Sequence, residues 1–83
     1  MDWEKETREN FDKIINKVPV FMRDVAKTKV SSCAERFAQN NDHSQVTEKD
    51  LVDAFFKETP FGFHGPLKTD MHEIGIDFTK YGH

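Results

Sequence analysis

The side chains best suited to chemistry in this 83-residue chain are a single cysteine and four histidines. Metal sites need such groups at particular spacings. His72-Glu73 is not followed by a second histidine four residues on, so it is not the helix of a zinc protease. Asp70 and Asp77 add carboxylates to this stretch, but the group is more typical of solvated turn residues than of an ion site. We therefore predict no metal centre at any of the histidines, which are His43, His64, His72 and His83.

Cys33 lies within a helical stripe of apolar residues, and two interpretations compete there. A small buried hydrophobic side chain is favoured over a nucleophilic or redox thiol, because no second cysteine or motif histidine accompanies it. The chain also lacks a glycine-rich phosphate loop, a Cys-x-x-Cys pair and an ordered set of Ser, His and Asp. We assign no catalytic residue, expect no cofactor, and leave open whether the chain is an enzyme.

Length and charge narrow the class of protein. A chain of 83 residues has room for one domain. The net charge of -3 argues against a nucleic-acid binder, because phosphate binding depends on clustered lysine and arginine. No apolar run approaches the roughly 20 residues of a membrane span, and the start of the chain lacks the pattern of a secretory signal. Together with the single cysteine, these features predict a soluble cytoplasmic protein.

The first expected helix covers residues 2–17. Asp2 is its expected N-cap. Trp3 has two interpretations: an anchor that packs the start of the helix onto the core, which we favour, or an exposed ring that meets a partner. The apolar side chains recur with helical spacing at Trp3, Phe11, Ile14, Ile15 and Val18.

The chain turns at the block Val18-Pro19-Val20-Phe21-Met22-Arg23. Pro19 has no N–H and disfavours helix in the residue before it, so one helix ends at about Val18 and the next begins. Residues 19–39 then carry the longest apolar stripe, which predicts a long central helix. The stripe consists of Met22, Ala26, Val30, Cys33, Ala34 and Phe37, widened by Phe21, Val25 and Ala38.

The third expected helix begins at Thr47 and ends before Thr59-Pro60. Thr47 and Asp50 have the spacing of a capping box, while the polar run of residues 40–45 closes the preceding helix. These signals predict a compact all-α fold with a three-helix domain over residues 1–59. Its expected core is Phe11, Ile14, Met22, Val30, Phe37, Leu51 and Phe55.

Residues 60–83 differ in composition from the helices. They contain all four glycines, two of the three prolines and four aromatic residues. Only a short helical pattern is present, around Leu67, Met71 and Ile74. Disordered segments rarely carry so many aromatic residues. We therefore expect an irregular C-terminal tail that packs on or near the domain, or meets a partner surface.

Several of these features together resemble a known family. Over about residues 3–56 the chain is similar to the small proto-chlorophyllide reductase-like domain, which forms a C-terminal module within light-independent protochlorophyllide reductase and also occurs as a stand-alone short protein. The features are Trp3, Val18-Pro19-Val20-Phe21-Met22-Arg23, Val30, Cys33-Ala34-Glu35, Val46-Thr47-Glu48, Leu51 and Ala54.

The resemblance implies an accessory module that docks on a larger redox or tetrapyrrole-related assembly. It implies no activity of this chain alone, because one cysteine cannot hold a four-thiolate iron–sulfur cluster. A second class of function stays open. The long central helix with short flanking helices also resembles half of a histone fold, which predicts a self-associating interaction module and a homodimer.

Docking is expected to use the turn before the central helix and the aromatic tail. The candidate partner-binding residues are Arg23, Lys27, Phe61, Phe63 and Tyr81. Arg23 is expected to be exposed beside Lys27, one helical turn on, so that Arg23→Ala leaves the melting temperature nearly unchanged and weakens partner capture. In the alternative, Arg23 forms an exposed pair with Asp24 or Glu4, which contributes at most about 1 kcal/mol.

Overall fold

The computed structural model describes all residues 1–83 as an all-helical chain, which confirms the fold class predicted from the sequence. No helix has the length and apolar character needed to cross a membrane. The four α-helices are α1 (Lys5–Ile15), α2 (Arg23–Asn40), α3 (Glu48–Glu58) and α4 (His64–Glu73). Three short 3-10 turns complete the fold, namely η1 (Val20–Met22), η2 (Phe61–Phe63) and η3 (Phe78–Tyr81).

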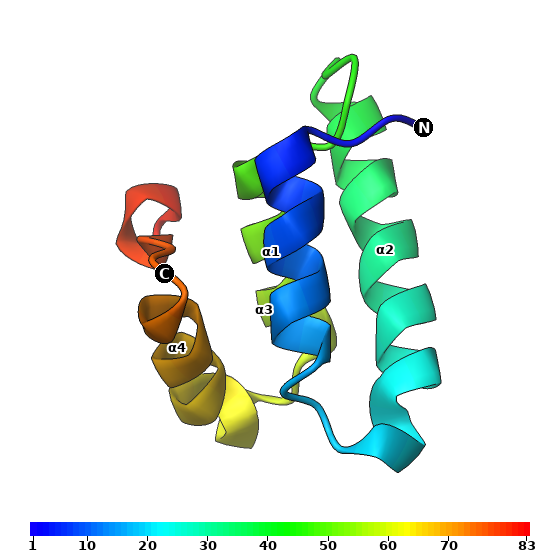
Figure 1. Cartoon of the computed structure of the whole chain (residues 1–83). Helices are drawn as coiled ribbons and strands as arrows, with labels where there is room; N and C mark the ends of the chain where they lie inside the picture. Colours follow the sequence, from blue (N-terminus) through cyan, green and yellow to red (C-terminus); the bar gives the residue numbers. More distant parts are fainter.

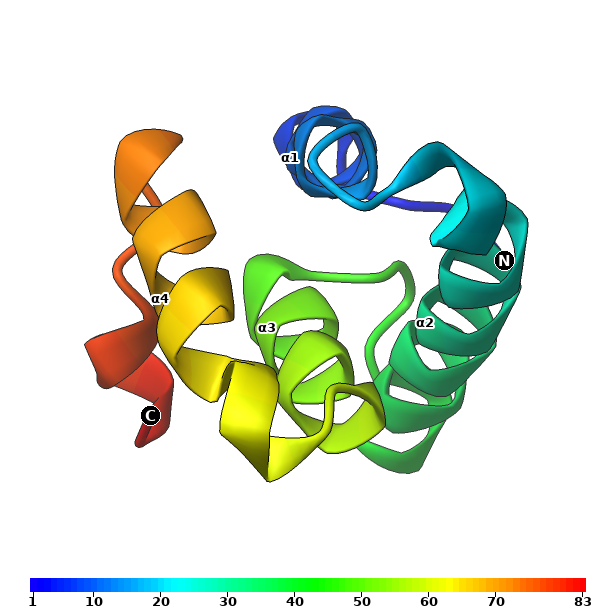
Figure 2. The same cartoon turned by 90° about the horizontal axis from the view of Figure 1, so that it is seen from below.

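The helices alternate in direction, so the α1–α2 and α3–α4 connections lie at the same end of the molecule (Figure 1). Seen from that end, α3 lies between α2 and α4, and α1, viewed nearly along its axis, lies above α3 (Figure 2). The most extensive helix contact is between α2 and α3. The longest helix is α2, as predicted, but the shorter α3 is the one that packs between the others.

The core is a single cluster of sixteen buried apolar residues. Five of the seven predicted core residues belong to it, namely Phe11, Ile14, Val30, Leu51 and Phe55. The prediction was wrong for Met22, which is 50% exposed because it belongs to the turn η1 and not to the helix behind it. Phe37 is only half-buried and packs against the edge of the cluster.

The start of the chain is extended, and this corrects the predicted helix boundary. Asp2 is not an N-cap, because its carbonyl oxygen accepts a hydrogen bond from Val46 N at 2.9 Å. Trp3 is the anchor we favoured: its Nε1 donates to Glu35 Oε2 at 3.0 Å, and its ring lies 5.1 Å from that of Phe11. Before α1 begins, the extended start of the chain therefore lies alongside Val46, two residues before α3.

The start of α3 has the predicted capping box. Thr47 Oγ1 accepts from Asp50 N at 3.4 Å, and Asp50 Oδ2 accepts from Thr47 N at 3.0 Å. The same Oδ2 accepts a hydrogen bond from His43 Nδ1 at 2.7 Å. Asp50 is fully buried, so these hydrogen bonds compensate for much of its lost hydration.

The tail is more regular than the sequence predicted, because it contains the ten-residue helix α4. Pro66 lies in the first turn of α4, where its missing N–H costs nothing, and Gly75 ends the helix with a φ of 84°. The glycine and proline content of residues 60–83 therefore led us to predict an irregular tail where the structure has a helix. Its inner face joins the core through Leu67 and Met71, and Ile76 follows them.

Candidate functional site: an apolar end built from two proline turns

The α1–α2 and α3–α4 connections, which lie at the same end of the molecule, have the same local structure. Each begins with a proline in an extended conformation, Pro19 with φ -51° and ψ 140° and Pro60 with φ -55° and ψ 144°. A three-residue 3-10 turn follows each proline, and a helix follows each turn. We call these two connections the proline turns.

In each proline turn, the basic side chain four residues after the proline donates hydrogen bonds to backbone carbonyl groups of residues that precede the proline. Arg23 donates from Nε to Val18 O at 2.9 Å and from Nη2 to Asn16 O at 2.7 Å. His64 Nε2 lies 2.9 Å from Thr59 O and 3.1 Å from Phe56 O, so it carries the proton and donates to both. These bonds satisfy carbonyl groups that the end of a helix leaves unpaired.

The proline turns also expose most of the large apolar side chains that the core does not cover. We call this surface the apolar end. Its most exposed members are Phe61, at 88%, and Phe21, at 84%. The complete set is Val20, Phe21, Met22, Val25, Phe61 and Phe63.

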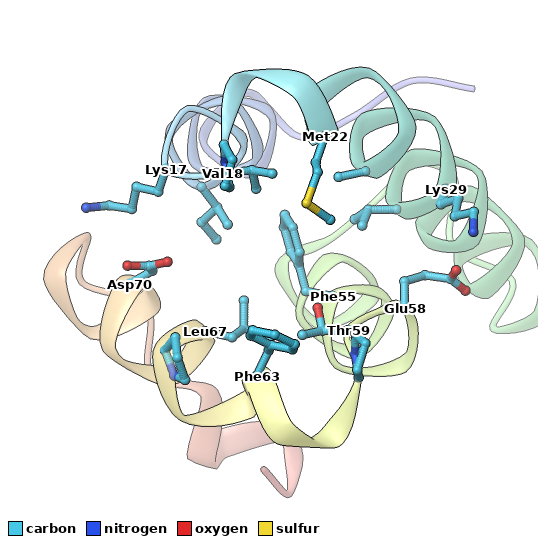
Figure 3. Close-up of a pocket in the computed structure, with 16 residues that line it drawn as sticks. Lys17, Val18, Met22, Lys29, Phe55, Glu58, Thr59, Phe63, Leu67 and Asp70 are labelled. Carbon is cyan, nitrogen blue, oxygen red and sulfur yellow. The ribbon is translucent and has the colours of Figure 1, made fainter.

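A cavity of about 380 Å³ lies between the two proline turns. Met22 and Phe63 point into it from opposite sides, and Phe55 lies between them (Figure 3). Its remaining apolar lining comes from α1, α2, α4 and the two connections: Ile14, Val18, Pro19, Ala26, Val30, Pro60, Pro66 and Leu67. Its volume and largely apolar lining are typical of a binding site.

The charged residues at the cavity are balanced in sign. Lys29 and Glu58 lie on one side, and Lys17 and Asp70 on the other (Figure 3). Lys17 Nζ lies 2.6 Å from Glu73 Oε2; this hydrogen bond raises the pKa of Lys17 and lowers the pKa of Glu73. Lys29 and Glu58 have no ion-pair partner within the chain, so they are available to a partner molecule.

The structure places the five predicted partner-binding residues in different surroundings. Phe61 and Phe63 belong to the apolar end, and Lys27 is exposed on α2. Arg23 is half-buried and bound to backbone carbonyls, which is neither the free side chain nor the acidic pair considered from the sequence. Tyr81 lies elsewhere, where its hydroxyl donates to Glu48 Oε1 at 3.0 Å.

Sequence reasoning missed four members of the apolar end, Val20, Phe21, Met22 and Val25. It assigned Phe21 and Val25 to the buried stripe of the central helix. A signal was present, because a stripe that includes Phe21 and Val25 as well as Met22 is wider than one helix face. The excess apolar width marks an exposed surface at the start of α2.

No histidine or cysteine lines this cavity. Cys33 is buried in the core, and burial raises the pKa of its thiol. No three side chains among histidine, cysteine, aspartate and glutamate are arranged to hold a metal ion. The cavity can therefore offer apolar contact and rim charges, and we assign it no catalytic group.

These features define a small all-helical domain with an apolar, solvent-open end. The chain belongs to the family described as DUF2621, a protein family of unknown function, which matches residues 1–83. None of the curated proteins or solved structures matches the chain.

The family match corrects the resemblance to the proto-chlorophyllide reductase-like domain, which was wrong. That resemblance depended most on the block of Pro19, Phe21 and Arg23 joined to the later Val46-Thr47-Glu48 start. The structure gives Pro19 and Arg23 a role in building the turn, while Phe21 is 84% exposed. The same arrangement recurs at Pro60 and His64, with no sequence block of that kind around it. A proline followed four residues later by a basic residue is therefore a way of building a helical turn in this chain.

Proposed function

We propose that this chain is a protein-interaction module that pairs with a second copy of itself through the apolar end. The observation that carries the proposal is the exposure of six large apolar side chains, five on two neighbouring turns and Val25 in the first turn of α2. Monomeric proteins seldom leave such a set open to water, because covering apolar surface is favourable.

The area of the apolar end suits a dimer. A phenylalanine offers about 150–250 Å², so the three exposed ones leave roughly 350–590 Å² open to solvent. Two valines and a methionine add to this figure. The total is close to the ~800 Å² that each partner contributes to a stable interface, and it exceeds the ~300–600 Å² of a usual largest patch.

The charges around the apolar end also favour a second copy. A two-fold interface brings the same surface of both molecules together, so it needs both signs of charge on that surface. Lys29 and Glu58 provide one of each without a partner in their own chain. An anionic membrane would instead attract a surface with an excess of lysine and arginine.

Sedimentation velocity over a concentration series of the full chain tests the proposal. We expect a reversible monomer–dimer equilibrium. Phe21→Ser and Phe61→Ser should each weaken it by about tenfold or more, because a central interface aromatic contributes about 1.4 kcal/mol or more. Gln45→Ser is the control and should leave the equilibrium unchanged, because Gln45 is exposed and belongs to the α2–α3 connection. That connection lies at the opposite end of the molecule (Figure 1).

A chain that stays monomeric at all concentrations would overturn self-pairing. The occupant of the apolar end would then be a different protein, which is the docking function considered from the sequence. A dimer that tolerates both serine variants would also contradict the proposal, because its interface would lie elsewhere.

A further inference from the structure

The two most exposed rings of the chain, Phe21 and Phe61, do not line the cavity beside them. Each lies within two residues of a side chain that does, Met22 in one turn and Phe63 in the other. Each proline turn therefore directs one apolar side chain into its own cavity and leaves one ring, 84% or 88% exposed, for another molecule. From this arrangement, and resting on the proposed self-pairing, we infer that each copy inserts Phe21 and Phe61 into the cavity of the other.

The size of the cavity fits this occupant. A protein cavity of about 150 Å³ lined by apolar side chains holds one benzene molecule. The cavity here measures about 380 Å³, which is room for about two phenyl rings. Each copy exposes two such rings at the same end, so the number of rings and the available space agree.

Phe61 and the cavity are supported by packed parts of the fold. Phe61 packs against the ring of His64 at 5.4 Å, and His64 is held by the carbonyl groups of Phe56 and Thr59. Phe55, between the two turns, is 3% exposed and belongs to the core. A rigid ring that enters a preformed cavity loses little conformational entropy on binding.

The insertion makes the site incomplete without the second copy. One molecule supplies the cavity floor, and the other supplies the rings. In a two-fold pair both molecules do both, so two equivalent insertions form at once. Lys29 and Glu58 line the cavity and have no ion-pair partner in their own chain. In the dimer, the Lys29 and Glu58 of one copy therefore share an interface with the oppositely charged residues of the other copy.

A complementation experiment tests the inference. Ala26 lines the cavity and is half-buried, so Ala26→Phe should fill the space while α2 keeps its helical face. The doubly substituted chain F21A/F61A lacks the rings but keeps an open cavity. Each variant alone should dimerise at least about tenfold more weakly than the unsubstituted chain, because neither homodimer contains an insertion.

Mixing the two variants should produce a heterodimer, because the rings of the filled chain can enter the open cavity of the ringless chain. Native mass spectrometry separates the heterodimer from either homodimer by mass. Thr28→Phe is the matched control: it adds the same ring to an exposed position of α2 outside the cavity and should leave dimerisation unchanged.

The outcomes separate this inference from the proposed function. If the unsubstituted chain is monomeric, self-pairing itself fails. If the chain dimerises but Ala26→Phe dimerises as tightly as the control, or the mixture gives no heterodimer, ring insertion is overturned while self-pairing stands. Should Ala26→Phe lose helicity by circular dichroism, Ala26→Leu replaces it, and an undiminished dimer of a folded Ala26→Leu chain overturns the inference.

Benzene supplies a second measurement on the unsubstituted chain. It should compete with the partner's rings and shift the equilibrium toward monomer. Benzene that occupies the cavity without changing the mass in solution would identify a small-molecule site and would overturn the inference.

Discussion

Arg23 donates hydrogen bonds across Pro19 to the carbonyl oxygens of Val18 and Asn16, at 2.9 and 2.7 Å. The bonds join the first residue of α2 to the chain that follows α1. The charged donor replaces partners that the proline and the end of the helix leave missing. Arg23, which the sequence predicted to be an exposed docking residue, thus stabilises the turn.

Arg23→Ala should lower stability, in contrast to the unchanged melting temperature expected from the sequence. Two hydrogen bonds from a charged, half-buried donor are worth about 1–2 kcal/mol, and the melting temperature of a chain this small should fall by roughly 4–16 °C. Thermal unfolding followed by circular dichroism measures the change. Lys27→Ala, one turn further along the same helix, is the control and should stay within about 0.5 kcal/mol of the parent. Equal stability of the two variants would show that these hydrogen bonds contribute nothing.

His64 should contribute in two separable ways. Its Nε2 donates to two carbonyl groups, and its ring lies perpendicular to that of Phe56 at a centroid distance of 5.1 Å. His64→Phe keeps a ring but removes the donor, and should cost about 1 kcal/mol. His64→Ala removes both and should cost more. Urea unfolding of the pair measures the difference, and two equal losses would assign the whole effect to the hydrogen bonds.

The sequence predicts those parts of the fold that depend on local patterns. The capping box at Thr47 and Asp50 needs only two residues three positions apart, and the structure has it. The stop at Pro60 and the long helix α2 follow equally local rules. The extended start was missed because it depends on a hydrogen bond between Asp2 and Val46, which are far apart in the chain.

The candidate site was harder to predict because the type of a residue does not determine whether its side chain is exposed. Phe21 and Phe55 have the same side chain, yet one is 84% exposed and the other 3%. A helical stripe tells which residues share a face, but only the packed structure tells whether another helix covers that face. The cavity itself exists because the turns at Pro19 and Pro60 end side by side, which no local pattern encodes.

Tyr81 should make stability depend on alkaline pH. Burial, helped by the hydrogen bond to Glu48, raises the pKa of Tyr81 from its ordinary value of 10 to about 12. The folded chain therefore keeps the phenol proton at a pH where the unfolded chain has lost it. The stabilisation is complete below about pH 10 and is lost as pH rises toward about 12.

The measurement for Tyr81 is direct because it is the only tyrosine. Phenolate absorbance should titrate near pH 12 in the folded chain and near pH 10 in urea. Urea unfolding should show a loss of stability between these pH values, and Tyr81→Phe should show less of it. A folded chain that ionises at pH 10 would contradict the half-buried, hydrogen-bonded phenol.

Cys33 should react slowly with thiol reagents while the chain is folded. It is 1% exposed, and burial raises the pKa of the thiol, so both access and the reactive thiolate are reduced. The rate of modification by a disulfide reagent at about pH 7 to 8, just below the ordinary pKa of a free thiol, should be limited by opening of the core, and it should rise by orders of magnitude in urea. Since Cys33 is the only cysteine, the signal has one source.

The control for Cys33 moves the thiol by one residue. Cys33→Ala combined with Ser32→Cys places the only thiol at an exposed position of the same helix, where it should react at the rate of a free thiol in both conditions. The alanine removes a small buried sulfur and should cost about 1 kcal/mol, so the control stays folded. Fast modification of Cys33 in the folded parent, at a rate matching the relocated thiol of the control, would mean that α2 and α3 separate readily. Slow modification would instead show that the helix pair holding the two proline turns is closed, which is the rigidity that ring insertion between two copies requires.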